Sequence, residues 1–163
     1  MWNIIKKTFN FEKKIKSCGI YKTQEYYKII TESQSETGLF LSQSPIFILP
    51  INCSINDFKN NIFQALNSSK NNVKMPSSNE KFKSMQKELL KDLKEKSFLN
   101  LYKNSTHCII RFEKNCKIFP TKFSNEYKGN IIVEEDIIEM EYSPEKELEI
   151  TEKIIEVLDK SYK

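Results

Sequence analysis

The sequence predicts an α/β (α+β) fold: one domain with a central mixed or mostly antiparallel sheet of about five or six strands and three or four packed helices. Three observations predict it. An extended apolar run followed by an amphipathic helix occurs twice, over residues 44–69 and 131–161. A Lys/Glu-rich helical pattern and a hairpin pattern lie between the two copies. The length of 163 residues fits a single domain spanning 1–163.

The first copy begins with the apolar run Pro45–Ile51, which is typical of a strand covered on both faces. Pro50 has no backbone N–H to donate, so it marks the end of that strand or a sheet edge. A helix then begins at Ser54, where Ser54 and Asp57 resemble a capping box. Its apolar positions recur at the helical period: Phe58, Ile62, Ala65 and Leu66.

The second copy begins with one or two strands over Ile131–Tyr142. Its helix starts at Ser143, and Pro144 suits the first helical position. The expected buried face nearly superimposes on that of the first helix: Leu148, Thr151, Ile154, Ile155 and Leu158. A duplicated strand–helix unit is one interpretation, and chance similarity of two amphipathic helices is the other.

The other elements follow from composition and periodicity. Before the first copy we expect residues 1–20 to form a short helix around Trp2–Phe11 or a loose arm. A strand over Lys22–Thr31, a polar turn over 32–38 and a short strand over Leu39–Leu41 should follow. Between the copies we expect a polar loop over Asn67–Asn79, a helix over Glu80–Lys96, a short helical turn over Ser97–Lys103, and a hairpin formed by Thr106–Phe112 and Cys116–Pro120.

Composition places the chain among globular proteins of a reducing compartment. The chain is 39% hydrophobic, and none of its apolar runs approaches the roughly 18 residues of a membrane span. The N-terminal stretch lacks the apolar region and cleavage site of a secretory signal. The four cysteines are widely spaced without a CxxC pair: Cys18, Cys53, Cys108 and Cys116. We therefore expect reduced thiols and a cytoplasmic location.

Catalytic and cofactor sites are not indicated. His107 is the only histidine, and the adjacent Cys108 should point to the opposite face of a strand. If the hairpin turn centres on residues 114–115, Glu113 pairs with Cys116, and Cys108 and Cys116 do not face each other. One histidine with scattered cysteines lacks zinc-ligand spacing, and no glycine-rich phosphate loop is present. We expect no enzyme, no metal and no cofactor.

Charge is divided unevenly along the chain. The net charge of +4 combines +11 over residues 1–130 with −7 over residues 131–163. The acidic part contains five closely spaced carboxylates: Glu134, Glu135, Asp136, Glu139 and Glu141. Alternation in the expected strand places Ile138, Met140 and Tyr142 toward the core and Ile137, Glu139 and Glu141 outward. The carboxylates form either a solvated face or a docking surface for a cationic partner.

Lysines interleaved with aromatic residues suggest a second possible function, nucleic-acid binding. They occur in two places, as Lys22 with Tyr26 and Tyr27, and as Lys117 with Phe119, Lys122 and Phe123. Such groups contact RNA in some proteins, but no RNA-binding signature accompanies them. A small basic nucleic-acid-binding module is therefore the alternative function, and the lysine content also fits an A/T-rich genome.

The order and spacing of these segments resemble a known family. The segments are the strand ending at Pro50-Ile51, the helix ending ALNSS at Ser69, the stretch FPTKF at Phe119–Phe123, and the final helix closing on IIEVLDKS. In order and spacing the chain is similar to the CdiI-type immunity proteins of contact-dependent growth inhibition (CDI) systems of Gram-negative bacteria. The resemblance covers residues 35–161, and residues 1–34 contain no matching pattern.

The resemblance implies a cytoplasmic inhibitor with no chemistry of its own. It implies that the partner is the C-terminal toxin domain of a cognate large exoprotein, often a nuclease, which the immunity protein neutralises by binding. Some related members accept a toxin β-hairpin onto a sheet, and an exposed strand edge supplies the backbone groups for that mode. We expect a monomer before toxin binding, with the five carboxylates as the contact surface.

Overall fold

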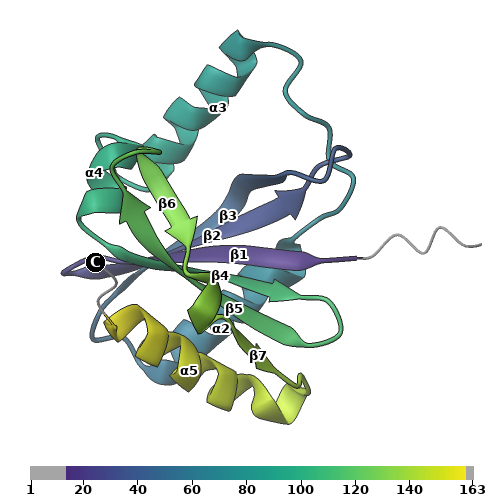
Figure 1. Cartoon of the computed structure of the whole chain (residues 1–163), viewed down its shortest axis with the longest axis vertical. Helices are drawn as coiled ribbons and strands as arrows, with labels where there is room; N and C mark the ends of the chain where they lie inside the picture. Colours follow the sequence, from purple (N-terminus) through teal and green to yellow (C-terminus); the bar gives the residue numbers. More distant parts are fainter. Residues whose placement is uncertain (1–13, 161–163) are drawn as a thin grey trace, which may run out of the picture.

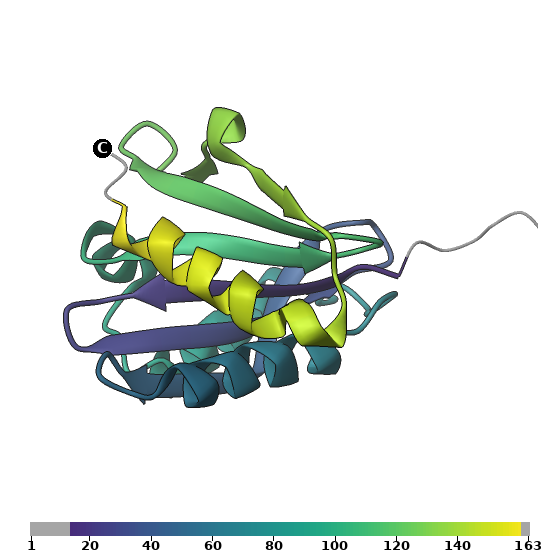
Figure 2. The same cartoon turned by 90° about the horizontal axis from the view of Figure 1, so that it is seen from below.

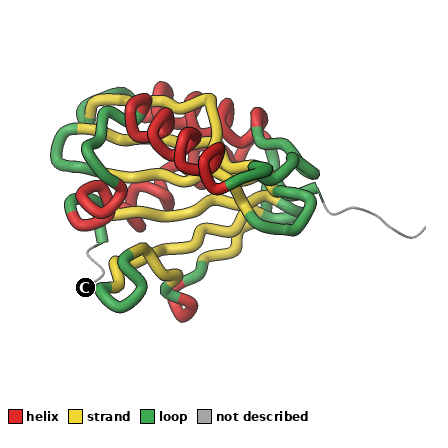
Figure 3. The backbone as a smooth tube through the Cα atoms, turned by 90° about the horizontal axis from the view of Figure 1, so that it is seen from above, coloured by secondary structure: helices red, strands yellow, loops and turns green. Residues whose placement is uncertain are grey.

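A seven-stranded antiparallel sheet forms the centre of the molecule. The computed structural model describes residues 14–160. Six strands lie in the order β3-β2-β1-β4-β5-β6, and β7 pairs with β5 beside β6 (Figures 1 and 3). Their bounds are β1 Lys16–Lys22, β2 Tyr26–Gln34, β3 Phe40–Pro50, β4 Thr106–Phe112, β5 Cys116–Ser124, β6 Gly129–Ile132 and β7 Ile138–Met140. The predicted fold class is confirmed.

Helices lie on both sides of this sheet. On one side α2 (Ile55–Ser68) and α5 (Glu147–Asp159) run next to each other, below the sheet in Figure 1 and in front of it in Figure 2. On the other side lie α3 (Asn79–Asp92) and α4 (Phe98–Lys103). Both of these helices and the polar loop before them occur where the sequence predicts them.

Two apolar cores hold the layers together. The main core lies between the sheet and the helices α2 and α5, with Ile20, Ile29, Phe58, Ile110 and Ile154 among its fully buried members. A smaller core joins the sheet to α3 and α4. Its buried members are Ile30, Leu89, Leu93 and Leu101. The sheet therefore has one face that is mainly apolar and one that is only partly covered by apolar residues.

The first strand–helix unit forms largely as predicted. The Ser54 hydroxyl accepts a hydrogen bond from the Asp57 backbone N–H at 3.0 Å, which caps α2. The four predicted apolar positions of this helix are all buried. Burial of one continuous stripe at the helical period stabilises the helix against the sheet.

The second unit differs at its start. A 3-10 turn, η2 (Pro144–Lys146), precedes α5, and Ser143 makes no capping hydrogen bond. The predicted core position Leu148 is wrong, because this side chain is 41% exposed while Ile150 is fully buried. The buried stripe of α5 therefore begins at Ile150, two residues later than predicted. Thr151, Ile154 and Leu158 are buried as predicted, and Ile155 is partly buried against the main core.

The N-terminal prediction misses a central strand. Residues 16–22, expected within a loose arm, form β1, which pairs with β2 and β4. The strand predicted over Lys22–Thr31 instead begins at Tyr26 and continues to Gln34. The Thr23 hydroxyl donates to the Tyr26 carbonyl at 3.1 Å and ends β1 in a turn. The helix or arm expected around Trp2–Phe11 lies outside the described residues.

Strand β3 also corrects the sequence interpretation. The two strands predicted over Leu39–Leu41 and Pro45–Ile51 are one strand, with an irregularity in its pairing opposite Ile30 and Thr31. β3 lies at the sheet margin and is half-buried, so it is not covered on both faces as expected. Pro50 ends the strand, as predicted.

The predicted hairpin of β4 and β5 is confirmed, but its register is not. Phe112 pairs with Cys116, so the turn holds three residues and Glu113 is part of it. Cys108 faces Pro120. The expectation that Cys108 and Cys116 are not cross-strand partners is therefore correct, although the pairing given for Glu113 is wrong.

Candidate functional site

The five predicted carboxylates gather at one margin of the sheet. We call them the acidic strip, which comprises Glu134, Glu135, Asp136, Glu139 and Glu141. The first three form the 3-10 turn η1 (Glu134–Asp136), Glu139 lies in β7, and Glu141 follows it. Asp136 is half-buried and the other four are exposed. The turn between β6 and β7 thus brings together charges that the sequence spreads over eight positions.

Internal partners occupy part of the acidic strip. Asp136 accepts a hydrogen bond from Lys160 Nζ at 3.1 Å, and Glu139 accepts one from Asn115 Nδ2 at 3.1 Å. Glu141 accepts one from Lys146 at 3.0 Å, which lowers the pKa of this carboxyl. Glu134 and Glu135 form no ion pair with any residue of the described range 14–160. These two carboxylates therefore present their charge to solvent.

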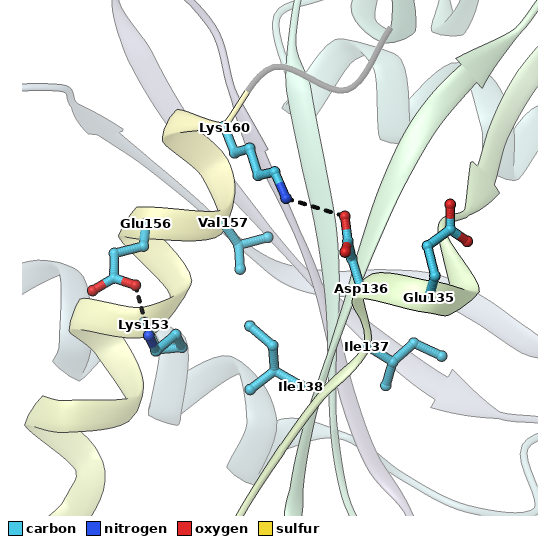
Figure 4. A pocket seen from close by; sticks show the side chains of 8 residues that line it. All are labelled: Glu135, Asp136, Ile137, Ile138, Lys153, Glu156, Val157 and Lys160. Atoms are coloured by element: carbon cyan, nitrogen blue, oxygen red, sulfur yellow. Dashed lines mark hydrogen bonds and ion pairs between the residues drawn. The ribbon is translucent and has the colours of Figure 1, made fainter.

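A cavity of about 430 Å³ lies between the acidic strip and α5 (Figure 4). Its floor is apolar and its rim is charged. Ile138 and Val157 supply apolar atoms, while Lys153 on the rim donates to Glu156 at 2.7 Å. Ile137, 38% exposed, also borders this space, but its side chain points to the other side of the segment from Ile138 in Figure 4. The combination of an apolar floor and a charged rim is the pattern of a protein contact surface.

The alternation predicted for this segment matches the structure at most positions. Ile138 and Met140 are partly buried and pack against the main core. Tyr142 is 39% exposed, yet its ring lies 4.7 Å from that of Phe112 and its hydroxyl donates to Glu147 at 3.0 Å. The apolar side of the segment anchors it, so the carboxylates beside it are held in place.

The thiols and the histidine are in unreactive states. Cys108 points into the main core while His107 lies on the opposite face of β4, as predicted. Burial raises the pKa of Cys108 and raises that of Cys116 to about 12, so both thiols keep their protons. Burial lowers the pKa of His107 to about 3, so its ring is neutral at physiological pH.

A polar network on the partly covered face of the sheet was missed by the sequence interpretation. The ring of His107 stacks on Tyr21, with centroids 4.1 Å apart, and its Nδ1 lies 2.8 Å from the Thr121 hydroxyl oxygen. The Ser17 hydroxyl donates to Glu32 at 2.7 Å. These side chains occupy alternate positions in adjacent strands. Apolar residues such as Ile30 and Ile109 lie between the polar residues of this face, so no regular alternation of polar residues marked it in the sequence.

The lysine and aromatic groups are only partly brought together. Lys117 and Phe119 share the polar face with Phe123, whereas Lys122 lies at an alternate position of β5 and faces the other way. Lys103 Nζ lies 5.8 Å from the centroid of the Phe123 ring. The second predicted group is therefore divided between two faces of the sheet.

Metal and membrane signals are absent from the described part of the chain. Among residues 14–160, no group of three or more His, Cys, Asp or Glu side chains is arranged to hold a metal ion. No helix in this range has the length and apolar character needed to cross a membrane.

Two solved structures share this fold. A protein of unknown function from Neisseria meningitidis superposes with a TM-score of 0.63 at 19% identity, covering 86% of this chain and 93% of that chain. A chain of the CdiA-CT/CdiI toxin and immunity complex from Yersinia pseudotuberculosis superposes with a TM-score of 0.66 at 12% identity. That match covers 89% of this chain and 95% of that chain. No curated protein sequence matches the chain.

The superpositions show only a shared fold, whereas a match to a family model assigns the chain to a family. The model of CdiI, the CDI immunity protein, matches residues 16–154, which include every strand of the described range and the first eight residues of α5. The match begins with β1 and includes the polar face and the acidic strip. The chain belongs to the CdiI family of CDI immunity proteins.

Proposed function

We propose that the protein neutralises the toxin domain at the C-terminus of a cognate CDI exoprotein by binding it in the cytoplasm, without catalysing a reaction. The family match over residues 16–154 is the observation that carries this proposal. The protonated thiols and the neutral His107 support it, because none of these groups is activated for nucleophilic or acid–base chemistry. We further propose that the toxin is a nuclease.

We propose the acidic strip as one contact surface of the complex. A nuclease carries a cationic surface where it binds its polyanionic substrate. Glu134 and Glu135 face solvent without internal ion pairs, so their charge is available to such a surface. The apolar anchoring of the neighbouring segment by Ile138 and Met140 keeps the charges in one geometry. Complementary charge of this kind increases the association rate more than it increases the affinity.

A growth-protection assay tests the function. Cells that express the toxin domain encoded beside this protein should stop growing, and co-expression of this protein should restore growth. The two purified proteins should form a stable 1:1 complex. Absence of both protection and a complex would exclude the immunity function.

Charge reversal tests the acidic strip separately. The double variant Glu134→Lys/Glu135→Lys should slow association with the toxin roughly tenfold at low salt, with little change in dissociation. Stopped-flow or biosensor kinetics at two salt concentrations measure both rates. The control variant Glu25→Lys/Glu36→Lys carries the same charge change at two exposed turn residues outside the strip. Equal rates for the two double variants would reject the strip and leave the immunity function standing.

A further inference from the structure

Arg111, the only arginine of the chain, lies across the polar face of the sheet. Its Cζ is 4.0 Å from the ring centroid of Phe40 and 5.3 Å from that of Phe119. Arg111 belongs to β4, whereas Phe40 belongs to β3, and β1 and β2 lie between these strands. The small residue Ser17 faces Arg111 on β1 and leaves room for the long side chain to cross. The guanidinium is therefore held by rings from two other strands.

Arg111 is half-buried, and its guanidinium is not part of an ion pair among the described residues 14–160. Its Nε atom is buried and has no hydrogen-bond partner in that range. Burial lowers the pKa of Arg111, and the nearby Glu32 offsets this in part. Glu32 itself accepts a hydrogen bond from Ser17 at 2.7 Å. An N–H donor left unsatisfied away from water is unfavourable, so a partner that forms hydrogen bonds with the guanidinium is favoured.

The geometry defines the chemistry of that partner. Rings against the guanidinium leave its edge as the hydrogen-bonding side, and the edge matches a planar acceptor with two oxygens. Lys117 is the cross-strand neighbour of Arg111 on β5 and adds a second positive charge to the same face. Glu32 lies close enough to interact with Arg111, and its negative charge disfavours the many charges of a nucleic acid more than the single charge of one carboxylate.

We propose that Arg111 is the receptor for a carboxylate side chain of the toxin, at the centre of a second contact surface on the polar face of the sheet. This inference rests on the proposed function. The surface is continuous with the acidic strip, because Glu139 of the strip pairs with Lys117, which in turn pairs with Arg111. A single toxin domain can therefore contact the cationic receptor and the acidic strip together.

Two substitutions test the receptor. Arg111→Met removes the charge and all donors, while Arg111→Lys keeps the charge and removes the planar fork. Both should weaken toxin binding at least about 30-fold, mainly through faster dissociation. The matched control Lys122→Met removes a lysine charge from the opposite face of β5 and should cost about fivefold or less. Kinetics of binding to the purified toxin domain provide the measurement, with thermal unfolding as the check on folding.

The outcomes separate this inference from the immunity function. If Arg111→Met binds within about fivefold of wild type, the receptor is excluded while immunity stands. If only Arg111→Met is impaired and Arg111→Lys binds fully, charge alone matters and planar recognition is excluded. If Arg111→Met abolishes binding of a single-stranded oligonucleotide while toxin binding is unchanged, the partner of this face is a nucleic acid. If the wild-type protein forms no toxin complex, both proposals are overturned.

A double-mutant cycle gives a second measurement that does not depend on one variant folding well. Each Asp and Glu on the toxin surface is replaced with Asn or Gln and combined with Arg111→Lys. One toxin carboxylate should lose its effect on affinity when Arg111 is replaced, while the others remain additive. Full additivity at every toxin carboxylate would overturn the assignment of the ligand.

Discussion

At the residue scale, the polar face of the sheet depends on close packing around His107. Gly19 lies on the same face, and a Cβ atom there would come within 3.0 Å of Glu32 Oε1 and 3.2 Å of His107 Nε2. A side chain at this position would therefore require Glu32 or His107 to shift, and the glycine favours the close packing rather than an unusual backbone angle. The Thr121 hydroxyl donates to the His107 carbonyl at 3.0 Å, which leaves the ring Nδ1–H to donate to Thr121. This arrangement fits a neutral ring.

The neutral ring predicts how stability depends on pH. Because the pKa of His107 falls to about 3 in the folded protein, its contribution is present above pH 6.5 and is lost as pH falls below that value. The folded protein should lose about 2 kcal/mol between pH 6 and pH 4.5, since one proton is worth roughly 1.4 kcal/mol per pH unit. Urea unfolding of the wild type and of His107→Asn at several pH values measures this slope.

Comparing the wild type with His107→Asn separates the contribution of His107 to the pH dependence from that of other groups. Burial raises the pKa of Glu32, so this carboxyl acts in the opposite sense and loses stability as pH rises. Glu32 is present in both proteins, and its contribution cancels when their unfolding free energies are subtracted. The difference should shrink steadily toward acid pH. A pH-independent difference would show that His107 titrates normally.

The sequence could reveal charge at this scale but not the polar network. The acidic strip is visible because its members lie within eight consecutive positions. The network joins Ser17, Glu32 and His107, which are spread over some ninety positions and meet only through strand pairing. No local pattern encodes that meeting. It depends on the order of strands, and this order could not be derived while β1 was assigned to an arm.

At the element scale, helices were easier to predict than strands. Each long helix shows a stripe of apolar residues at the helical period, which is a local signal. β1 contains Ser17, Gly19 and Tyr21 at the positions of one face, so it lacks the apolar continuity of a central strand. Pro45 divides β3 in the sequence, yet pairing with β2 continues on both sides of it. The bounds of β1 and β3 therefore depend on pairing with neighbouring strands, which local sequence patterns do not reveal.

The two helix starts differ in a way that mutation can measure. Ser54 caps α2 through its hydroxyl, whereas Ser143 precedes the 3-10 turn η2 without such a bond. Ser54→Ala should lower the free energy of unfolding by about 1 kcal/mol, while Ser143→Ala should change it by about 0.5 kcal/mol or less. Thermal or urea unfolding of both variants measures the contrast. Equal losses would mean that the two helices begin alike, as a strict duplication requires.

At the scale of the whole molecule, the sheet separates a mainly apolar face from the polar face on which we propose that the toxin binds. The helices α2 and α5 cover one face with the larger apolar core. The other face holds the polar network, Arg111 and a smaller core under α3 and α4. The acidic strip lies at the margin where β7 meets β5.

A buried ion pair fixes the smaller layer to the sheet. Lys28 of β2 lies 2.5 Å from Glu95 and donates to the Leu93 carbonyl at 2.7 Å. Both side chains of the pair are largely buried, with 6% and 12% of their surfaces exposed. Leu93 is fully buried in the same small core. The pair therefore joins the loop between α3 and α4 to the centre of the sheet.

Removing one partner should loosen that layer. Glu95→Gln should lower the free energy of unfolding by about 3 kcal/mol, because it leaves the buried Lys28 charge uncompensated. The double variant Lys28→Met/Glu95→Leu should lose less than Glu95→Gln alone, since it removes both charges together. The exposed pair of Lys153 and Glu156 supplies the control, and Glu156→Gln should cost about 0.5 kcal/mol or less. Urea unfolding measures all three, and hydrogen exchange should show the Glu95→Gln loss first in α4. If Glu95→Gln cost no more than Glu156→Gln, the pair would not hold the layer to the sheet, and the smaller core alone would have to do so.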